Sequence, residues 1–98
     1  MIEITTKGLT ACQITGHAGY APKGTDIVCA AVSALYGGLV TSLNAHSDCL
    51  MSVVETEDGY NLTIDYPDSA STLLMKAFIT SVSAIADNYP KHIKVITS

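Results

Sequence analysis

The sequence predicts an α+β fold in two layers, with two helices packed on a mostly antiparallel five-stranded sheet. Apolar and polar residues alternate in five short segments, whereas in two longer segments apolar residues recur at spacings of three and four. In chain order the segments read β-β-α-β-β-α-β. A length of 98 residues is enough for one hydrophobic core but not for two. We therefore expect a single domain over residues 1–98, with one active or binding region.

The first two strands are expected to form a hairpin. Residues 2–5 alternate between apolar and polar side chains, and a second extended run covers about 9–16, with Gly8 between the two. In the second strand Cys12 and Ile14 share one face because side chains alternate along a strand. We expect that face to point into the core.

A first helix is expected from about residue 26 to about residue 45. Its apolar stripe consists of Ile27, Ala31, Ala34, Leu35, Leu39 and Leu43. Gly37 and Gly38 lie in the middle of this helix, where each glycine costs about 1 kcal/mol relative to alanine. Close approach of another backbone would compensate for that cost, and a kink is the alternative.

A second hairpin follows the first helix. Apolar residues at 51, 53 and 54 indicate one strand, and Asp58-Gly59 is typical of a tight turn. The next strand alternates cleanly through Tyr60, Leu62, Ile64 and Tyr66.

The second helix begins after the segment 66–69, where a proline breaks the strand and Asp68 and Ser69 supply capping oxygens. Its apolar stripe is Leu74, Phe78, Val82 and Ile85. Pro90 ends the helix. Alternation at Ile93 and Val95 then predicts a short last strand.

The composition suggests what the surface binds. Hydrophobic residues make up 48% of the chain and charged residues only 14%, so we expect a second copy to cover part of the apolar surface, as in a homodimer. The net charge is -4, and five Lys and Arg residues cannot form the basic stripe that grips phosphates, so we expect no direct contact with nucleic acid. A mildly acidic surface weakly attracts a basic polypeptide.

The sequence is typical of a cytoplasmic protein. It begins MIEITTKG, without the charged and apolar regions of a signal peptide, and no apolar run approaches membrane-spanning length, so we expect no membrane contact. Its three cysteines, at 12, 29 and 49, form no C-x-x-C pair, and their odd number fits a reducing compartment.

Among these cysteines, Cys29 is the candidate nucleophile. Only the thiolate is nucleophilic, and helix N-termini or a nearby imidazolium stabilise it. Cys29 lies in the first turn of the first helix, where free amides and the positive end of the helix dipole are found. Cys12 faces the core and Cys49 lies at the edge of a strand, so neither has such a source of positive potential.

His17 is the candidate general base. It ends the strand that precedes the first helix, so the loop between them can fold it back beside Cys29. The amides at the start of the helix would then also be placed to stabilise an oxyanion. From the residues alone, the alternative is a buried structural cysteine and an ordinary histidine at a strand end.

Two further side chains are candidates for supporting this site. Asp26 could orient the histidine, or it could simply cap the helix. Ser33, one turn beyond Cys29, could line a cleft or bond back to a carbonyl. Glycines at 16, 19 and 24 suggest that the loop is mobile and closes over a bound peptide.

No metal or other cofactor is expected. Cys29, His17, Asp26 and Cys49 supply suitable donor atoms, but their positions show no paired ligand spacing. The other two histidines, at 46 and 92, are typical of surface or capping positions.

Two motifs in this region resemble those of the ribosomal-processing cysteine proteases, the Prp or YsxB-like family. The first is Gly16-His17-Ala18, and the second is the run GTDIVCAAVS at 24–33. The chain also agrees with the family in length and element order, and Asn88-Tyr89-Pro90 looks similar.

The resemblance implies a cysteine endopeptidase that removes a short N-terminal extension from a large-subunit ribosomal protein during ribosome assembly. It places the nucleophile at Cys29 and the general base at His17, with Asp26 and Ser33 at supporting positions. It also implies a homodimer. The alternative interpretation is a non-catalytic module that binds a peptide or a ribosomal protein with the same loop and helix start.

Overall fold

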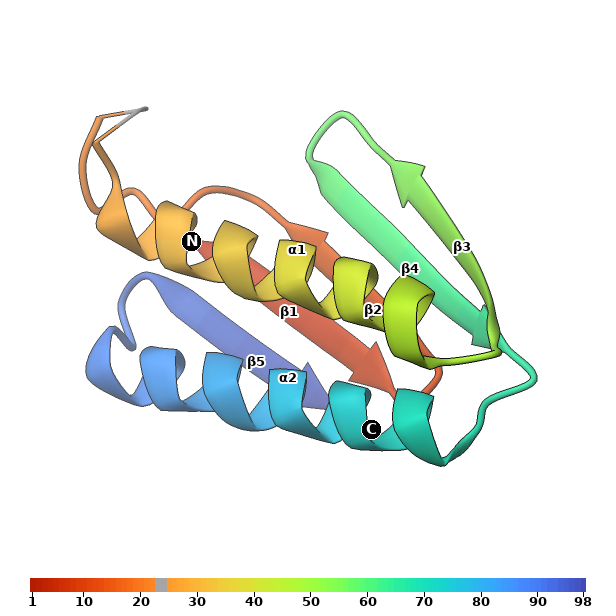
Figure 1. Ribbon diagram of the computed structural model, residues 1–98. Helices are drawn as coiled ribbons and strands as arrows, with labels where there is room; N and C mark the ends of the chain where they lie inside the picture. The colour runs from red at the N-terminus through yellow and green to blue at the C-terminus, as the bar shows by residue number, and fades with distance from the viewer. Residues whose placement is uncertain (23–24) are drawn as a thin grey trace.

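The computed structural model describes residues 1–22 and 25–98 and places seven elements in the predicted order (Figure 1). They are β1 (Ile2–Lys7), β2 (Ala11–Thr15), α1 (Ile27–His46), β3 (Leu50–Glu55), β4 (Gly59–Asp65), α2 (Ser69–Asn88) and β5 (Ile93–Thr97). Gly24, one of the three glycines predicted to make the loop mobile, lies outside the described residues.

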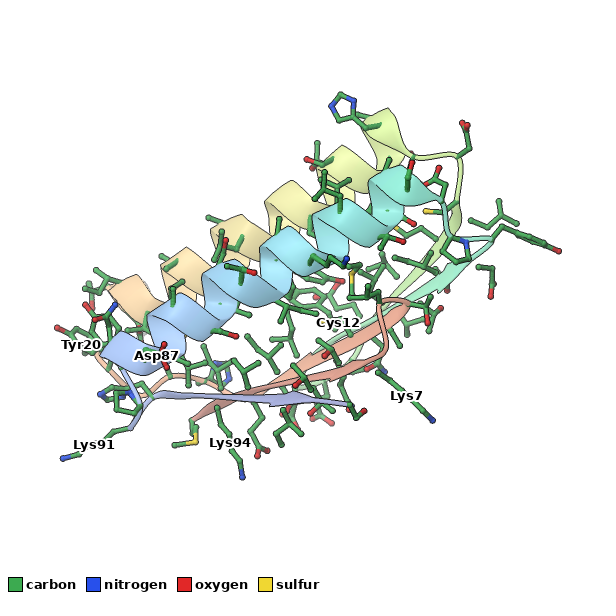
Figure 2. All side chains as sticks on the ribbon, turned by 90° about the horizontal axis from the view of Figure 1, so that it is seen from below. Lys7, Cys12, Tyr20, Asp87, Lys91 and Lys94 are labelled. Atoms are coloured by element: carbon green, nitrogen blue, oxygen red, sulfur yellow. The ribbon has the colours of Figure 1, made fainter. Side chains whose placement is uncertain are left out.

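The strands form one sheet in the order β3-β4-β2-β1-β5. The pairs β1·β2, β2·β4 and β3·β4 are antiparallel, and only β1·β5 is parallel, which confirms the mostly antiparallel sheet. Both helices lie on the same face of this sheet, and Lys7 and Lys94 project from the opposite face (Figure 2). The molecule therefore has two layers, and its core lies between the helices and the sheet.

Cys12 and Ile14 of β2 point into the core, as predicted. Cys12 and Ile14 are 3% and 7% exposed, and Ile4 of β1 is completely buried opposite Ile14. Alternation along β4 likewise buries Leu62 and Ile64. Burial of such side chains stabilises the fold by roughly 1.5–3 kcal/mol each.

The stripe predicted for α1 is displaced by one position in the first half of the helix, whereas Leu39 and Leu43 are buried as predicted. The buried residues of this helix are Val28, Val32, Tyr36, Leu39 and Leu43, whereas Ile27 is 56% exposed and Ala34 is also exposed. Alanines fitted the expected spacing, but they bury little apolar area. The larger valine and tyrosine side chains therefore decide which face of α1 packs on the sheet.

The prediction for α2 agrees better with the structure. Phe78 and Val82 are buried together with Met75, and Leu74 and Ile85 pack at the margin of the core. Asp68 is the N-cap of the helix, and the C-cap is Tyr89, immediately before Pro90.

The glycine predictions need two corrections. Within the described ranges nothing lies within 4 Å of where a Cβ at Gly37 or Gly38 would sit, so no second backbone approaches α1 there. The tight turn predicted at Asp58-Gly59 is present, closed by backbone hydrogen bonds between Thr56 and Gly59, but Gly59 is its last residue and begins β4. A Cβ at Gly59 would overlap the carbonyl oxygen of Ile14. A glycine is needed at this position because β4 and β2 approach so closely.

The expectation about membrane-spanning length was wrong. Both helices have 20 residues and are apolar enough, by length and composition, to cross a membrane. Core helices of soluble proteins pass the same test, and here each helix buries one stripe against the sheet. Alanine is frequent in both helices, and neither forms the continuous run of large apolar side chains expected of a membrane span.

Candidate active site

A cleft of about 740 Å³ opens at the N-terminal end of α1. Cys29, His17, Asp26 and Ser33 all line it, together with Gly16 and Gly19 of the loop that follows β2. Residues 55–60, which form the end of β3, the connecting turn and the start of β4, line it as well. The fold thus brings the four predicted side chains together from two separate segments of the chain.

Cys29 occupies the third position of α1, and its side chain is half-buried at the cleft. The backbone N–H of Ala18 donates a hydrogen bond to its Sγ at 3.4 Å. The sulfur is therefore held against the loop that follows β2, at the edge of the cleft.

The other two thiols have different surroundings. Cys12 lies in the core, where burial raises its pKa to about 11. Cys49 lies between the C-terminal end of α1 and β3, and its side chain is half-buried against the core. Only Cys29 therefore combines a position in the cleft with a backbone donor.

Asp26 is the N-cap of α1, and both of its carboxylate oxygens accept hydrogen bonds. Oδ1 accepts from the amides of Val28 at 2.9 Å and Cys29 at 3.0 Å, and Oδ2 accepts from those of Tyr20 at 3.0 Å and Ala21 at 3.4 Å. The Cys29 amide contributes most to holding the pKa of Asp26 below its ordinary value, because these bonds favour the carboxylate. The side chain thus caps the helix and anchors the loop.

This arrangement corrects the expected oxyanion site. The amides of Val28 and Cys29, which we expected to be free at the start of the helix, both donate to Asp26. A carboxylate also repels a developing oxyanion. These two amides are therefore not available for that role in this structure.

His17 is exposed at the mouth of the cleft. It follows Gly16, which has φ +83° and would overlap the carbonyl oxygen of Met1 if it carried a Cβ. In the described part of the chain no hydrogen bond joins the His17 ring to Cys29 or Asp26. Ser33 is exposed one turn beyond Cys29 and lines the same cleft.

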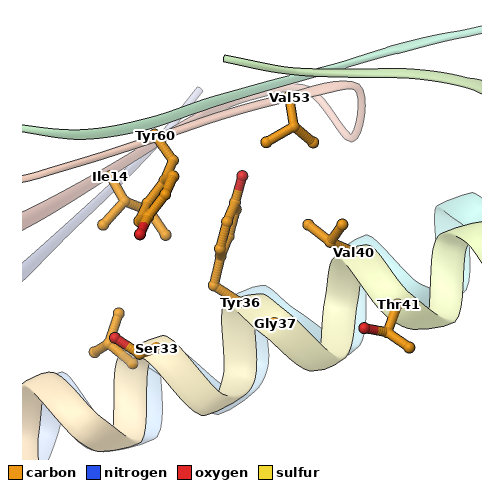
Figure 3. Close-up of a pocket in the computed structure, with 9 residues that line it drawn as sticks. Ile14, Ser33, Tyr36, Gly37, Val40, Thr41, Val53 and Tyr60 are labelled. Atoms are coloured by element: carbon orange, nitrogen blue, oxygen red, sulfur yellow. The ribbon is translucent and has the colours of Figure 1, made fainter. Parts of the chain in front are cut away.

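An apolar recess of about 320 Å³ lies beside the cleft and shares Ile14, Ser33 and Tyr60 with it (Figure 3). Tyr36 of α1 stacks on Tyr60 of β4, with ring centroids 5.1 Å apart. The Tyr36 hydroxyl is buried and has no hydrogen-bond partner among the residues described, and burial raises its pKa.

The sequence did not predict that Ala18 donates to Cys29, that residues 55–60 line the cleft, or that an apolar recess lies beside it. No local pattern marks them, because their roles come from contacts between segments distant in sequence. His92 was also missed, although its Nδ1 lies 2.8 Å from the carbonyl oxygen of Ala18. Within residues 1–22 and 25–98 no three His, Cys, Asp or Glu side chains lie close enough together to hold a metal ion.

A half-buried thiol at a helix start, in an open cleft that a histidine also lines, is the kind of site found in cysteine hydrolases. Comparison with known proteins narrows this class. The family model described as cysteine protease Prp matches residues 1–94. The chain therefore belongs to the cysteine protease Prp family, a family of peptidases, as the motifs around His17 and Cys29 predicted.

Individual relatives agree with this assignment. The ribosomal processing cysteine protease Prp of Bacillus subtilis (strain 168) is 29% identical over 99 residues, which cover 94% of this chain and 88% of that protein. The crystal structure of the ribosomal processing protease Prp from S. aureus, with a covalently linked product peptide, superposes with a TM-score of 0.95. That chain is 20% identical, and 100% of each chain is covered, which confirms the fold.

A second solved structure, SMU.848 from Streptococcus mutans, is 37% identical. It has a TM-score of 0.76 and covers 100% of this chain and 96% of its own.

Proposed function

We propose that this chain is a cysteine endopeptidase that removes a short N-terminal extension from a large-subunit ribosomal protein during ribosome assembly. Cys29 is its nucleophile and His17 its general base. The observation that carries the proposal is the half-buried Cys29 Sγ, which accepts the Ala18 N–H in a cleft that His17 also lines. Membership of the Prp family supports it, and the B. subtilis relative is named for ribosomal processing.

The reaction follows from these groups. His17 takes the proton of the Cys29 thiol, and the sulfur attacks the carbonyl carbon of the scissile peptide bond. When the tetrahedral intermediate collapses, the C–N bond breaks and His17 returns the proton to the departing amine. Water then attacks the thioester while His17 accepts a proton from it. The C–S bond breaks, His17 returns this proton to the departing sulfur, and the carboxylic acid product leaves with the thiol and the neutral imidazole regenerated.

Asp26 and Ser33 have supporting roles in this proposal. Asp26 acts on the backbone, because its carboxylate holds the start of α1 and the amides of the preceding loop. Ser33 contributes a hydroxyl to the floor that continues into the apolar recess. The proposed movement of the loop around Gly16 and Gly19 on peptide binding stays a prediction, and amide hydrogen exchange with and without peptide measures it.

The walls of the cleft suit a basic, partly apolar peptide. Glu55, Glu57 and Asp58 line one side, and their negative charge attracts Lys and Arg side chains. The neighbouring recess has mainly apolar walls and receives an apolar side chain of the same peptide. Both features fit an extension taken from a ribosomal protein, since such proteins bind RNA through basic residues.

We further propose that residues 1–98 act as one catalytic domain, that two copies form a homodimer, and that the protein works in the cytoplasm. Exposed apolar side chains such as Leu50, Val54 and Leu73 support an interface with a second copy. All three cysteines are free, as expected in a reducing compartment. Light scattering at several concentrations tests the dimer.

The proposal is tested with a peptide that spans the junction between such an extension and the mature protein. Wild-type protein cleaves it once, and Cys29→Ala abolishes cleavage but leaves the far-UV circular dichroism unchanged. Cys49→Ala, which removes a half-buried thiol outside the cleft, keeps the activity. Cleavage by the Cys29→Ala variant would refute the assignment, and tight binding without cleavage by the wild type would favour the non-catalytic module.

A further inference from the structure

His92 reaches the active-site loop from the opposite end of the sequence. It lies in the connection between α2 and β5, where its own backbone is fixed: its N–H donates to the Tyr89 carbonyl and its carbonyl accepts from Ile2 N–H, both at 2.9 Å. Its half-buried side chain brings Nδ1 to 2.8 Å from the carbonyl oxygen of Ala18. Because a carbonyl can only accept, Nδ1 must carry the proton in this contact.

Ala18 is therefore held at both of its backbone polar groups. Its N–H donates to Cys29 Sγ at 3.4 Å and its carbonyl accepts from His92, while its methyl group is buried at 3% exposure. His17 directly precedes Ala18. The conformation that His92 imposes on Ala18 thus also fixes the direction in which the chain presents His17 to the cleft.

The ring of Tyr20 closes this arrangement. It meets the His92 ring edge to face with centroids 5.3 Å apart, and the Tyr89 ring in the same way at 5.6 Å. The backbone N–H of Tyr20 donates to Asp26 Oδ2 at 3.0 Å. Figure 2 shows Tyr20 at the end of the molecule where α1 begins and α2 ends. The loop is thus tied on one side to the cap of α1 and on the other to the connection that carries His92.

We propose that His92 is a positioning residue for the active site. By donating from Nδ1 to the Ala18 carbonyl, it holds the Ala18 N–H on the Cys29 sulfur and His17 at the cleft. This inference rests on the proposed function for its effect on cleavage but not for its effect on the loop or on the thiol. A role confined to packing the start of β5 would lower stability without changing the reactivity of Cys29.

Three variants separate the two roles. His92→Asn keeps an N–H donor near the position of Nδ1, whereas His92→Leu keeps much of the volume and removes the donor. His46→Leu removes an exposed histidine at the far end of α1 and serves as the matched control. Each variant is measured for the rate of Cys29 alkylation by iodoacetamide at pH 7, for kcat and KM on the junction peptide, and for Tm.

We expect His92→Leu to slow both alkylation and kcat by about tenfold with a smaller change in KM, because the reacting groups lose their alignment. His92→Asn recovers most of both rates, and His46→Leu matches the wild type. Wild-type alkylation and cleavage rates in His92→Leu would overturn the proposal, and so would equal losses in the Leu and Asn variants.

A measurement on the unmodified protein covers the case in which His92→Leu fails to fold. Long-range ¹H–¹⁵N NMR spectra distinguish the two neutral tautomers of His92. The proposal requires the proton on Nδ1, and a neutral ring protonated only on Nε2 would overturn it. The wild type could show the Nδ1-protonated tautomer, with slower Cys29 alkylation in His92→Leu, and still cleave no junction peptide. In that case the proposed function would fail and the positioning role would stand.

Discussion

The two helices of this protein begin in the same way but are used differently. Each has 20 residues and an aspartate as N-cap, Asp26 in α1 and Asp68 in α2, and the third position of each carries a small polar side chain. That position is Cys29 in α1 and Ser71 in α2. Tertiary contacts make the difference: they bury Ser71 at the start of α2, and they leave Cys29, the proposed nucleophile, at a cleft.

At the start of α2 the third residue is turned back onto its own cap. Asp68 Oδ1 accepts from Ser71 N–H at 2.8 Å, and Ser71 Oγ accepts from Asp68 N–H at 3.0 Å. The carboxylate also accepts from Ser47 Oγ and Asp48 N–H, so it joins the end of α1 to the start of α2. Ser71 is completely buried, so solvent does not reach the third residue of α2.

At the start of α1 the corresponding side chain turns toward another segment. Cys29 Sγ accepts from Ala18 N–H and lies half-buried at the cleft. The Asp26 carboxylate accepts from the loop amides of Tyr20 and Ala21 as well as from its own helix. The loop after β2 therefore provides the donor to the sulfur and part of the cleft lining, whereas the segment that reaches the cap of α2 contacts Asp68 through Ser47 and Asp48.

The largest expected effect comes from making the two helix starts alike. Cys29→Ser gives α1 the same third residue as α2 and removes the thiol. We expect cleavage of the junction peptide to fall by about 10⁴-fold or more, because a serine hydroxyl is far less acidic than a thiol and a base suited to the thiol activates it poorly. The Tm should stay within a few degrees of the wild type. Near-wild-type cleavage would show that the sulfur is not the nucleophile.

A smaller effect on cleavage is expected from removing the N-cap aspartate of one helix but not of the other. Asp26→Ala and Asp68→Ala each remove a cap, so both should lower Tm to a similar extent. Only Asp26→Ala should also slow cleavage, by about ten- to a hundredfold, because it frees the loop that aligns Ala18 and His17. Equal activity losses in the two variants, measured well below both Tm values, would mean that the loop anchor has no special role.

The next comparison places a thiol at the start of α2. Ser71→Cys in a Cys29→Ser background puts sulfur at the equivalent position of a helix start that is sealed. We expect iodoacetamide at pH 7 to modify this thiol at least about tenfold more slowly than Cys29 in the wild type, because access is needed in addition to the helix dipole. Equal rates would show that helix position alone activates the sulfur.

The smallest effect is the response to acid. Hydrogen bonds to its carboxylate, with the largest contribution from the Ser71 amide, lower the pKa of Asp68 to about 2, compared with about 3.9 for a free aspartate. A lowered pKa in the folded state stabilises the protein fully above the unfolded value and is lost as the pH falls toward the folded value. Between pH 4 and pH 2, Tm should therefore fall less steeply in Asp68→Asn than in the wild type. Parallel curves would contradict this assignment.

Local patterns in the sequence predicted the elements well and the contacts between them poorly. Alternation and caps located all five strands and both helices, since these depend on near neighbours. The phase of the first half of α1 was missed because its alanines fit the expected stripe as well as the larger Val28 and Val32.

The same limit applies to the site. Cys29 and Asp26 were found from their place at a helix start, and the structure shows that Asp26 acts as the cap. The loss of the expected oxyanion amides to Asp26, and the contact of His92 with Ala18 across 74 residues, depend on how the loop folds. No spacing in the sequence encodes them.

If Cys29 is the nucleophile, it must be the most reactive thiol of this chain. Limiting iodoacetamide at pH 7, followed by peptide mapping, compares the three cysteines in one sample. We expect Cys29 to be modified at least about tenfold faster than Cys49 and to be protected by saturating junction peptide, while Cys12 stays unmodified in the core. Equal rates at Cys29 and Cys49, with no protection by peptide, would contradict it.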